Sequence, residues 1–512
     1  MTDTPWQGDA SSLVDAFRAG ERSPVEELEA SLAAIETSDL NAFSHLDPEW
    51  AHRAAEHADV TKPFGGVPTG IKQLEPVQGW PHTEASLVFA DRVAEYTAVN
   101  VQRLLEKGGV TPVGQTTASE FGGLNVSVTK INGVTHNPWR HGHTVGGSST
   151  GSAAAVAGGL VSIASGGDGG GSIRIPAGYT GLLGMKGTFG RIPRSPKAYM
   201  RPNTVVLGCL ARSVRDAARY YDVCAGPDTA DPSSLPTHPS FEAGLESHDL
   251  AGLRVAIIPA FSGVELEPGV EENLIEHAEA MIDATGMKRV EVPLELPSLA
   301  AQWMMGNMAT LLPDLAEHWP QCAPLLTDEI ALGLFLSKTL YNLDTAAKAE
   351  VQRIEADEAM AEAFRHCDLI VSATNPGPAF NAEWSTSSPE PPPVKFIKGS
   401  AIGRGVLRGL LGGVRLATAA APGLPNAMID IANRRFPDFV AMGGLTMLAN
   451  LYGNPAVSIP AGTVNGLPVG MQVMAPHHHD ALLLDVARSV EVNNPWPLVA
   501  PGVAAPATPA SA

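Results

Sequence analysis

The sequence is poor in cysteine and contains no long apolar run. Its four cysteines are scattered through 512 residues with no CxxC spacing: Cys209, Cys224, Cys322 and Cys367. This excludes a disulfide framework and favours buried thiols in a reducing cytosol. No apolar run approaches the roughly 18 residues of a membrane span, and the first residues lack the basic-then-apolar order of an export signal. We therefore expect a cytoplasmic protein without a membrane span.

Positive charge is also scarce. Lys and Arg number 34 against 54 Asp and Glu, which gives a net charge of -20. Because nucleic-acid-binding proteins need basic faces, we expect no nucleic-acid partner. One segment, residues 391–429, instead has no acidic residue and carries Lys395, Lys398, Arg404, Arg408 and Arg415. It is either an interfacial or lid segment or a glycine-rich surface loop that happens to be basic.

What the sequence does contain is typical of a globular enzyme. Hydrophobic residues make up 44% and charged residues 17%. Apolar spacing predicts two helices within residues 10–35 and a helix over 97–107, followed by a strand at 111–115. Helices that alternate with strands indicate a mainly parallel sheet covered on both faces. The low-complexity tail, residues 499–512, is expected to be disordered.

Two clusters of glycine and serine, residues 146–152 and 165–172, are the most unusual part of the chain. An alanine-rich helix over 153–157 and a short strand over 160–164 separate them and would bring them together. Successive glycines in the second cluster allow backbone N–H groups to turn toward one point, which suits an anion. Two serine clusters at one place predict a hydrolase centre.

The first cluster also fits the nucleophile elbow of α/β-hydrolases. Residues 147–151 read G-x-S-x-G, with Ser149 as the nucleophile. This hypothesis needs a downstream histidine, which residues 477–479 could supply. However, Asp480 looks like a helix N-cap and the histidines like its exposed lead-in. A metal site from the same histidines is weaker still, because adjacent side chains point in different directions.

A phosphate cradle at residues 166–171 does not fit. A P-loop requires Gly-Lys-Ser/Thr, and no lysine follows Gly171. A dinucleotide fingerprint requires a helix directly after the glycines, and residues 173–176, Ile-Arg-Ile-Pro, are not expected to begin one.

The remaining interpretation combines both serine clusters with a lysine that follows a predicted turn. The chain resembles the amidase signature family, and the resemblance extends over about residues 10 to 495. The matching motifs lie at residues 66–72 (GVPTGIK), 137–139 (NPW), 146–149 (GGSS), 168–176 (DGGGSIRIP), 211–216 (ARSVRD) and 466–472 (GLPVGMQ).

The resemblance implies a catalytic triad. Lys72 would be the base, Ser148 the bridging serine after a cis peptide bond, and Ser172 the nucleophile. A charged lysine cannot accept a proton, so Lys72 must be buried to lower its pKa. Ser148 would relay the proton between Lys72 and Ser172 and then to the leaving amine. Ser149 would be a supporting hydroxyl.

The resemblance also implies an oxyanion hole. Its donors would be the N–H groups of Gly169, Gly170, Gly171 and Ser172. Asp168 and Arg174 could pair or hold the loop. The chain departs from the family pattern at Gln73, where an acidic residue is common, at Thr150 and at Gly169. The segment 196–203 is also atypical and predicts that Tyr199, Met200 and Arg201 line the substrate site.

From these observations we expect one amidase domain over residues 1–498. Its fold would be α/β: an α/β/α sandwich around a mixed, mostly parallel sheet, with a helical cap at about 295–440. The expected activity is hydrolysis of a C–N bond other than a peptide bond in a fairly apolar aryl or acyl amide. Carbamates (urethanes) and esters stay open as substrates.

The resemblance further implies no metal and no cofactor. The expected partner is a small-molecule amide or carbamate, and a homodimer is one open arrangement. Two alternatives stand beside the amidase: a component of an assembly that transamidates charged tRNA, and the α/β-hydrolase with Ser149 as nucleophile.

Overall fold

The computed structural model describes residues 4–197, 203–297, 306–383 and 443–501. An 11-stranded sheet forms its centre, in the order β1-β3-β2-β6-β8-β7-β12-β13-β11-β9-β10. The strands are β1 (Phe43–Leu46), β2 (Pro68–Lys72), β3 (Thr111–Thr116), β6 (Ile163–Asp168), β7 (Leu183–Lys186), β8 (Val206–Ala211), β9 (Arg254–Ile257), β10 (Lys288–Val290), β11 (Leu369–Ala373), β12 (Ala456–Val464) and β13 (Leu467–Met474). A separate small hairpin pairs β4 (Val128–Thr129) with β5 (Gly133–Val134).

The mixed α/β sheet confirms the predicted fold class, but the expectation that its strands are mostly parallel is wrong. Only β2 with β3, β2 with β6, β9 with β10 and β9 with β11 pair in parallel among the described strands. The other pairs are antiparallel, including β6 with β8 and β12 with β13. Helix and strand do alternate in the sequence, but β12 and β13 form a hairpin, and β8 returns beside β6. Alternation alone therefore does not fix strand direction.

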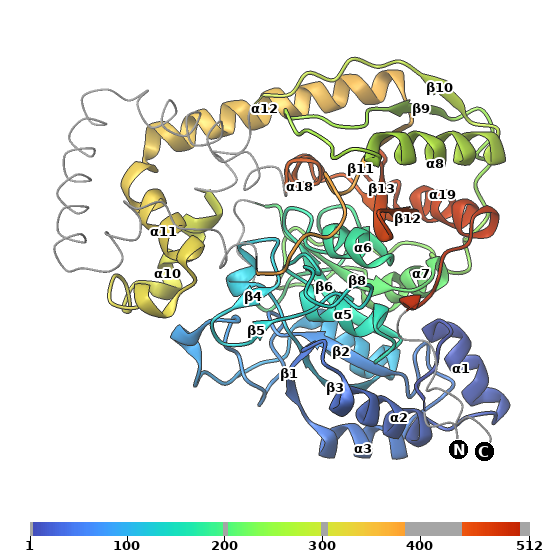
Figure 1. Cartoon of the computed structure of the whole chain (residues 1–512), viewed down its shortest axis with the longest axis vertical. Helices are drawn as coiled ribbons and strands as arrows, with labels where there is room; N and C mark the ends of the chain where they lie inside the picture. The colour runs from blue at the N-terminus through green and yellow to red at the C-terminus, as the bar shows by residue number, and fades with distance from the viewer. Residues whose placement is uncertain (1–3, 198–202, 298–305, 384–442, 502–512) are drawn as a thin grey trace.

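Helices cover both faces of the sheet (Figure 1). One apolar core joins the sheet to α1 (Ala10–Ala19), α4 (Val99–Arg103), α7 (Val214–Cys224), α8 (Val270–Thr285) and α19 (Asp480–Asn493). A second core contains α2 (Pro24–Thr37), α3 (Pro48–Glu56), α5 (Thr150–Ala157) and α6 (Arg174–Thr180). The sandwich that the sequence predicted is thus present.

The alanine-rich helix α5 is the innermost of these helices. All of its residues are buried, and Ala153 to Ala157 are at most 1% exposed. Small side chains allow the helix to pack closely against β2, β3, β6 and β8. Because α5 begins at Thr150, it holds the first serine cluster against the sheet.

The helical cap consists, in its described part, of α10 (Leu312–Leu315), α11 (Asp328–Leu340) and the long α12 (Leu343–His366). Figure 1 shows α10 and α11 to one side of the sheet, with α12 leading back to it. β11 then enters the sheet between β9 and β13, so the range predicted for the cap also contains a sheet strand. The short α18 (Met447–Tyr452) packs against α12.

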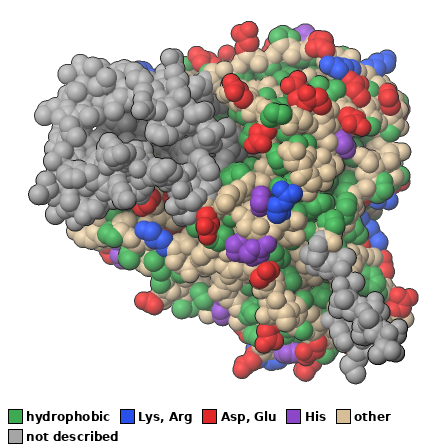
Figure 2. All heavy atoms as spheres, in the orientation of Figure 1, with side chains coloured by type: hydrophobic (Ala, Val, Ile, Leu, Met, Phe, Trp, Pro, Cys, Tyr) green, Lys and Arg blue, Asp and Glu red, His purple; other side chains and the backbone are tan. Residues whose placement is uncertain are grey.

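On the face that Figure 2 shows, acidic side chains of the described residues are spread out and do not gather in one patch, in agreement with the net charge of -20. Within the described residues, no helix is both long enough and apolar enough to span a bilayer. The basic segment 391–429 and residues 502–512 of the predicted tail lie outside the described residues.

Candidate active site

Lys72 ends the central strand β2, and its side chain is only 3% exposed. Its Nζ lies 2.9 Å from the Ser148 Oγ, 2.9 Å from the Ser149 Oγ and 3.2 Å from the Gly167 carbonyl oxygen. Burial lowers the pKa of Lys72 to about 8, against the negative charges of Glu75, Asp168 and Glu84, which raise it. A lysine with this pKa is neutral often enough near neutral pH to accept a proton.

The two serines beside Lys72 are not equivalent. The Ser149 hydroxyl donates to the Gly167 carbonyl oxygen at 3.3 Å while its oxygen accepts from Lys72. The Ser148 hydroxyl has no acceptor among the described residues other than Lys72 itself. When Lys72 is neutral, Ser148 can therefore donate its proton to the Nζ. The peptide bond between Gly147 and Ser148 is cis, as the resemblance implies.

Ser172 lies in the turn between β6 and α6 and is 4% exposed. The Ser149 N–H donates to the Ser172 carbonyl oxygen at 3.2 Å, which holds the two serine clusters side by side. No described group forms a hydrogen bond with the Ser172 Oγ. The structure thus brings Lys72 to Ser148 and places Ser172 next to this pair, without a hydrogen bond between Ser148 and Ser172.

A buried ion pair holds the loop that carries Ser172. The side chains of Asp168 and Arg174 are both 0% exposed, and the Arg174 Nη2 lies 3.0 Å from the Asp168 Oδ1. Burial disfavours the charge on Asp168, but the charge and hydrogen bonds of Arg174 outweigh it and hold the pKa of the carboxyl well below its usual range. Asp168 and Arg174 therefore both pair and hold the loop, the two roles that the sequence left open.

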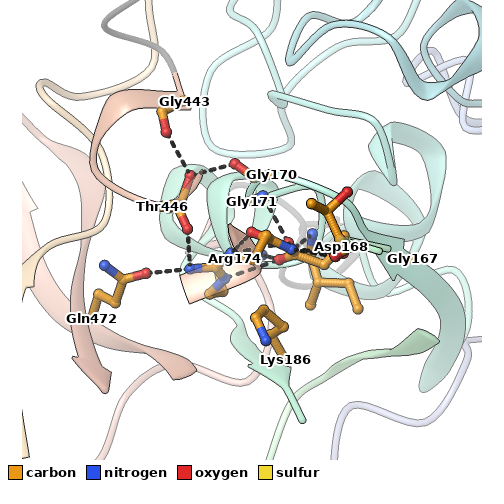
Figure 3. Close-up of polar contacts among 12 residues, drawn as sticks. Gly167, Asp168, Gly170, Gly171, Arg174, Lys186, Gly443, Thr446 and Gln472 are labelled. Carbon is orange, nitrogen blue, oxygen red and sulfur yellow. Dashed lines mark hydrogen bonds and ion pairs between the residues drawn. The ribbon is translucent and has the colours of Figure 1, made fainter. Parts of the chain in front are cut away.

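The Asp168 carboxylate also takes up backbone donors of this loop. It accepts from the N–H groups of Gly171 at 2.7 Å, Ile173 at 3.2 Å and Arg174 at 3.3 Å. Gly171 is one of the predicted oxyanion donors, and its N–H points to Asp168 (Figure 3). The N–H groups of Gly169, Gly170 and Ser172 have no acceptor among the described residues, and their role as oxyanion donors stays a prediction.

Contacts from distant parts of the chain complete this support (Figure 3). Arg174 donates to the Gln472 Oε1, to the Asn450 Oδ1 and, at 2.8 Å, to the Thr446 carbonyl oxygen. The Thr446 hydroxyl donates to the Gly170 carbonyl oxygen at 2.6 Å. Sequence reasoning assigned no role to these three residues. One signal was available, since Gln472 is a polar residue inside the apolar strand β13.

The segment at η3 (Glu120–Gly122) forms a wall beside Ser148. The Ser119 N–H donates to the Ser148 carbonyl oxygen at 3.3 Å, and a Cβ placed on Gly122 would lie 3.3 Å from the Ser148 Oγ. A Cβ on Gly123 would lie 2.6 Å from the Cδ1 of Ile330 in α11. The apolar core of the cap therefore reaches the edge of the site.

Glu120 joins this wall to the cap. Its buried carboxylate accepts from the Ser86 hydroxyl at 2.6 Å and from the Thr327 N–H, at the start of α11, at 2.7 Å. Sequence reasoning missed Glu120 because its partners are 34 and 207 residues away.

Several sequence predictions fall elsewhere. Tyr199, Met200 and Arg201 lie outside the described residues.

The histidines of the elbow hypothesis bond other groups: His477 bonds the Tyr452 carbonyl oxygen at 2.7 Å, and His479 bonds the His477 carbonyl oxygen at 2.9 Å. Asp480 is not an N-cap but the first residue of α19. The described residues contain no group of three or more His, Cys, Asp or Glu side chains that could hold a metal.

The expectation that no helix begins at residues 173–176 is also wrong. Helix α6 begins at Arg174, directly after Ser172 and Ile173. Its first turn is stabilised by the Asp168 carboxylate, which accepts the Ile173 and Arg174 N–H groups. The rejection of a P-loop on the missing lysine does not depend on this helix.

Comparison with known proteins identifies the family. The sequence model of the Amidase family matches residues 26–395 and 418–484. The chain belongs to the Amidase family. It is 31% identical over 508 residues to a Glutamyl-tRNA(Gln) amidotransferase chain of Akkermansia muciniphila, covering 93% of this chain and 97% of the relative. It is 30% identical over 499 residues to an acylamidase of Rhodococcus erythropolis, covering 95% of each.

Solved structures of this family share the fold. A bacterial aryl acylamidase of the amidase signature enzymes matches with a TM-score of 0.79 at 22% identity, over 96% of this chain and 97% of that chain. A 6-aminohexanoate cyclic dimer hydrolase complexed with its substrate also matches with a TM-score of 0.79, at 25% identity, over 97% and 99%. The amidase signature fold predicted from the motifs is thereby confirmed, and family membership makes this chain an amidase-type enzyme.

Proposed function

We propose that this amidase hydrolyses a fairly apolar aryl or acyl amide through an acyl-enzyme on Ser172. The observation that carries the proposal is the 2.9 Å contact between the buried Lys72 Nζ and the Ser148 Oγ. This contact gives the site a base that can be neutral and a hydroxyl that can pass a proton to it.

The proposed proton path of the first half-reaction uses this contact and a transfer from Ser172 to Ser148. The Ser172 Oγ attacks the amide carbonyl carbon while its proton passes to the Ser148 Oγ and the Ser148 proton passes to Lys72. The carbonyl oxygen becomes an oxyanion, which the N–H groups of Gly169, Gly170 and Ser172 would stabilise. When the C–N bond breaks, Lys72 returns a proton through Ser148 to the leaving nitrogen. This yields a free amine and an ester on Ser172.

The second half-reaction repeats these steps with water. Water attacks the ester carbonyl carbon and loses its proton through Ser148 to Lys72. The tetrahedral intermediate then collapses to a carboxylic acid, and Ser172 regains its proton. The Ser149 hydroxyl, which is bound to the Gly167 carbonyl oxygen, would hold the Lys72 Nζ in place.

The apolar character of the substrate rests on the cap. A cluster of buried side chains in and around α10 and α11 packs against Phe89, Phe121 and Leu124: Met308, Leu315, Cys322, Leu326, Ile330 and Leu334. Gly122 and Gly123 connect this cluster to Ser148. Phe89, Phe121 and Leu124 are only partly buried, and an aryl or alkyl group of a bound amide would gain free energy by contact with them.

Turnover of matched substrates tests the proposal. An anilide and an aryl ester with the same acyl group would be compared with an N-aryl carbamate of the same aniline, with Ser172→Ala as the control. Anilide hydrolysis that disappears in Ser172→Ala supports an amidase, and the carbamate and ester rates then rank urethanase and esterase activity. Failure to cleave any of the three would contradict the proposal.

A second candidate function is that of one chain in an amidotransferase assembly. The observation that favours it is the 31% identity to a Glutamyl-tRNA(Gln) amidotransferase chain over 93% of this sequence. The acidic charge of the sequence argues against a basic surface for RNA. Affinity purification from the native host tests this candidate. Stoichiometric partner chains, together with glutamine hydrolysis that depends on them, would favour it over the free amidase.

A further inference from the structure

Glu75 is a buried carboxylic acid that the mechanism above does not use. It lies three residues after Lys72 and is 4% exposed. Its N–H donates to the Lys72 carbonyl oxygen at 2.8 Å, so both residues belong to one tight turn. The Asn100 Nδ2 donates to its Oε2 at 3.1 Å. No arginine or lysine forms an ion pair with Glu75 within the described residues.

Glu75 and Lys72 are two buried titratable groups in one turn, although their side chains form no direct ion pair. Together they are uncharged either as an ammonium and a carboxylate or as an amine and a carboxylic acid. The second form places no charge in the protein interior and leaves Lys72 ready to accept a proton. Burial raises the pKa of Glu75, and the positive charge of Lys72 opposes this rise. The charge on each group therefore affects how readily the other holds a proton.

The other titratable groups near Lys72 and Glu75 either have partners of opposite charge or stay neutral. Asp168 is kept ionised by Arg174. Glu84, which is a quarter exposed, lies 2.9 Å from the His82 Nε2 and 3.5 Å from the Arg92 guanidinium. Near Glu75, burial raises the pKa of both Tyr220 and Cys224, so these two groups stay neutral. Glu75 is thus the buried acid that has no cation other than Lys72 to balance its charge within the described part of the chain.

We propose that Glu75 is a positioning residue whose buried charge, in the same turn as Lys72, sets the pH range in which Lys72 is a free base. The inference rests on the proposed function, because it assigns a role to Lys72 in amide hydrolysis. It follows that the charge of Glu75, and not its shape, controls the acid side of the pH profile.

The test replaces Glu75 by its neutral isostere. An ionised Glu75 raises the pKa of Lys72, so Glu75→Gln should move the acid limb of kcat/KM to lower pH. A shift of one pH unit corresponds to about a tenfold gain in kcat/KM at a fixed pH on the acid limb, when kcat/KM is expressed relative to the variant's own maximum. The matched control is Glu27→Gln, which removes another buried glutamate, one whose pKa burial also raises to about 7, but which pairs with Arg22 away from the site.

A second variant covers the case in which Glu75→Gln does not fold. The Asn100 hydrogen bond favours ionised Glu75. Asn100→Leu should therefore favour the neutral acid and move the acid limb in the same direction, by less. An acid limb that stays in place, or moves to higher pH, in the folded variants would overturn the inference while Ser172-dependent turnover remains. Absence of turnover in the unmodified protein would instead overturn the proposed function and the inference with it.

Discussion

Lys72 and Ser148 are 76 residues apart in the sequence, yet the Nζ of one lies 2.9 Å from the Oγ of the other in a buried site. The contact forms because β2 and β6 pair in parallel as neighbouring interior strands of the sheet, and α5 packs over both strands. Lys72 ends the first strand, Gly167 and Asp168 end the second, and Ser148 precedes the helix. The fold thus brings together three chain segments whose local structures are individually simple.

Replacing Lys72 by Met should remove the base and keep most of the side-chain volume. We expect kcat/KM to fall by about 10²- to 10⁴-fold with little change in KM. Lys186→Met is the matched control, because Lys186 is also fully buried but binds the carbonyl oxygens of Gly187 and Asn454. Steady-state kinetics on folded protein should show the loss in Lys72→Met alone; an equal loss in both variants would argue against a base role.

The pH dependence of kcat/KM should follow the protonation state of Lys72. Because Lys72 acts in its neutral form and its pKa is lowered to about 8, kcat/KM should rise with pH and reach half of its plateau near pH 8. Below that pH the lysine holds a proton and cannot accept another. The measurement is kcat/KM for an uncharged anilide between about pH 6 and 10. A rate that falls over this range would contradict the assignment.

The buried ion pair between Asp168 and Arg174 should contribute to the free energy of unfolding. Asp168→Asn leaves Arg174 charged and unpaired in the interior, which costs about 3 to 5 kcal/mol of the free energy of unfolding. Urea denaturation measures this loss. Glu279→Gln, which breaks the surface pair with Arg289, should cost about 1 kcal/mol or less. Similar losses in the two variants would show that the buried pair does not hold the loop.

Gly171 offers a direct test of the loop geometry. It has φ +124°, and an added Cβ would lie 2.2 Å from the Thr446 Oγ1. Gly171→Ala should therefore displace the loop and lower kcat as well as stability. Gly79→Ala is the control, since Gly79 has φ +89° but nothing within 4 Å of an added Cβ. The Gly79→Ala variant should lose about 1 to 3 kcal/mol of the free energy of unfolding through backbone strain and keep its kcat. Normal kcat in Gly171→Ala would mean that the loop position is not critical.

The local parts of the site could be predicted from the sequence, and the distant parts could not. Lys72, Ser148 and Ser172 lie in short motifs that resemble the amidase signature family, and this resemblance implied that they meet. Thr446 and Asn450 support the loop through contacts across more than 270 residues, which no local pattern reveals. No sequence pattern indicated a role for Glu75, because its burial and its contact with Asn100 depend on the packing of the fold.

Strand direction was harder to predict for a similar reason. β12 and β13 are apolar segments, but their pairing depends on which strand each one meets after the chain turns. The helix at Arg174 was missed because proline is tolerated in a first helical turn and the Asp168 carboxylate accepts the N–H groups at its start. The predictions for Tyr199, Met200, Arg201 and the segment 391–429 concern residues outside those described, and they stay predictions.

Acyl-enzyme trapping tests the central claim most directly. The protein and its Ser148→Ala, Ser149→Ala and Ser172→Ala variants would be treated with a fluorophosphonate, and the adduct located by mass spectrometry. The account predicts one adduct on Ser172, which is lost in Ser172→Ala, slowed strongly in Ser148→Ala and retained in Ser149→Ala. An adduct on Ser149 would contradict it and restore the hydrolase-elbow hypothesis.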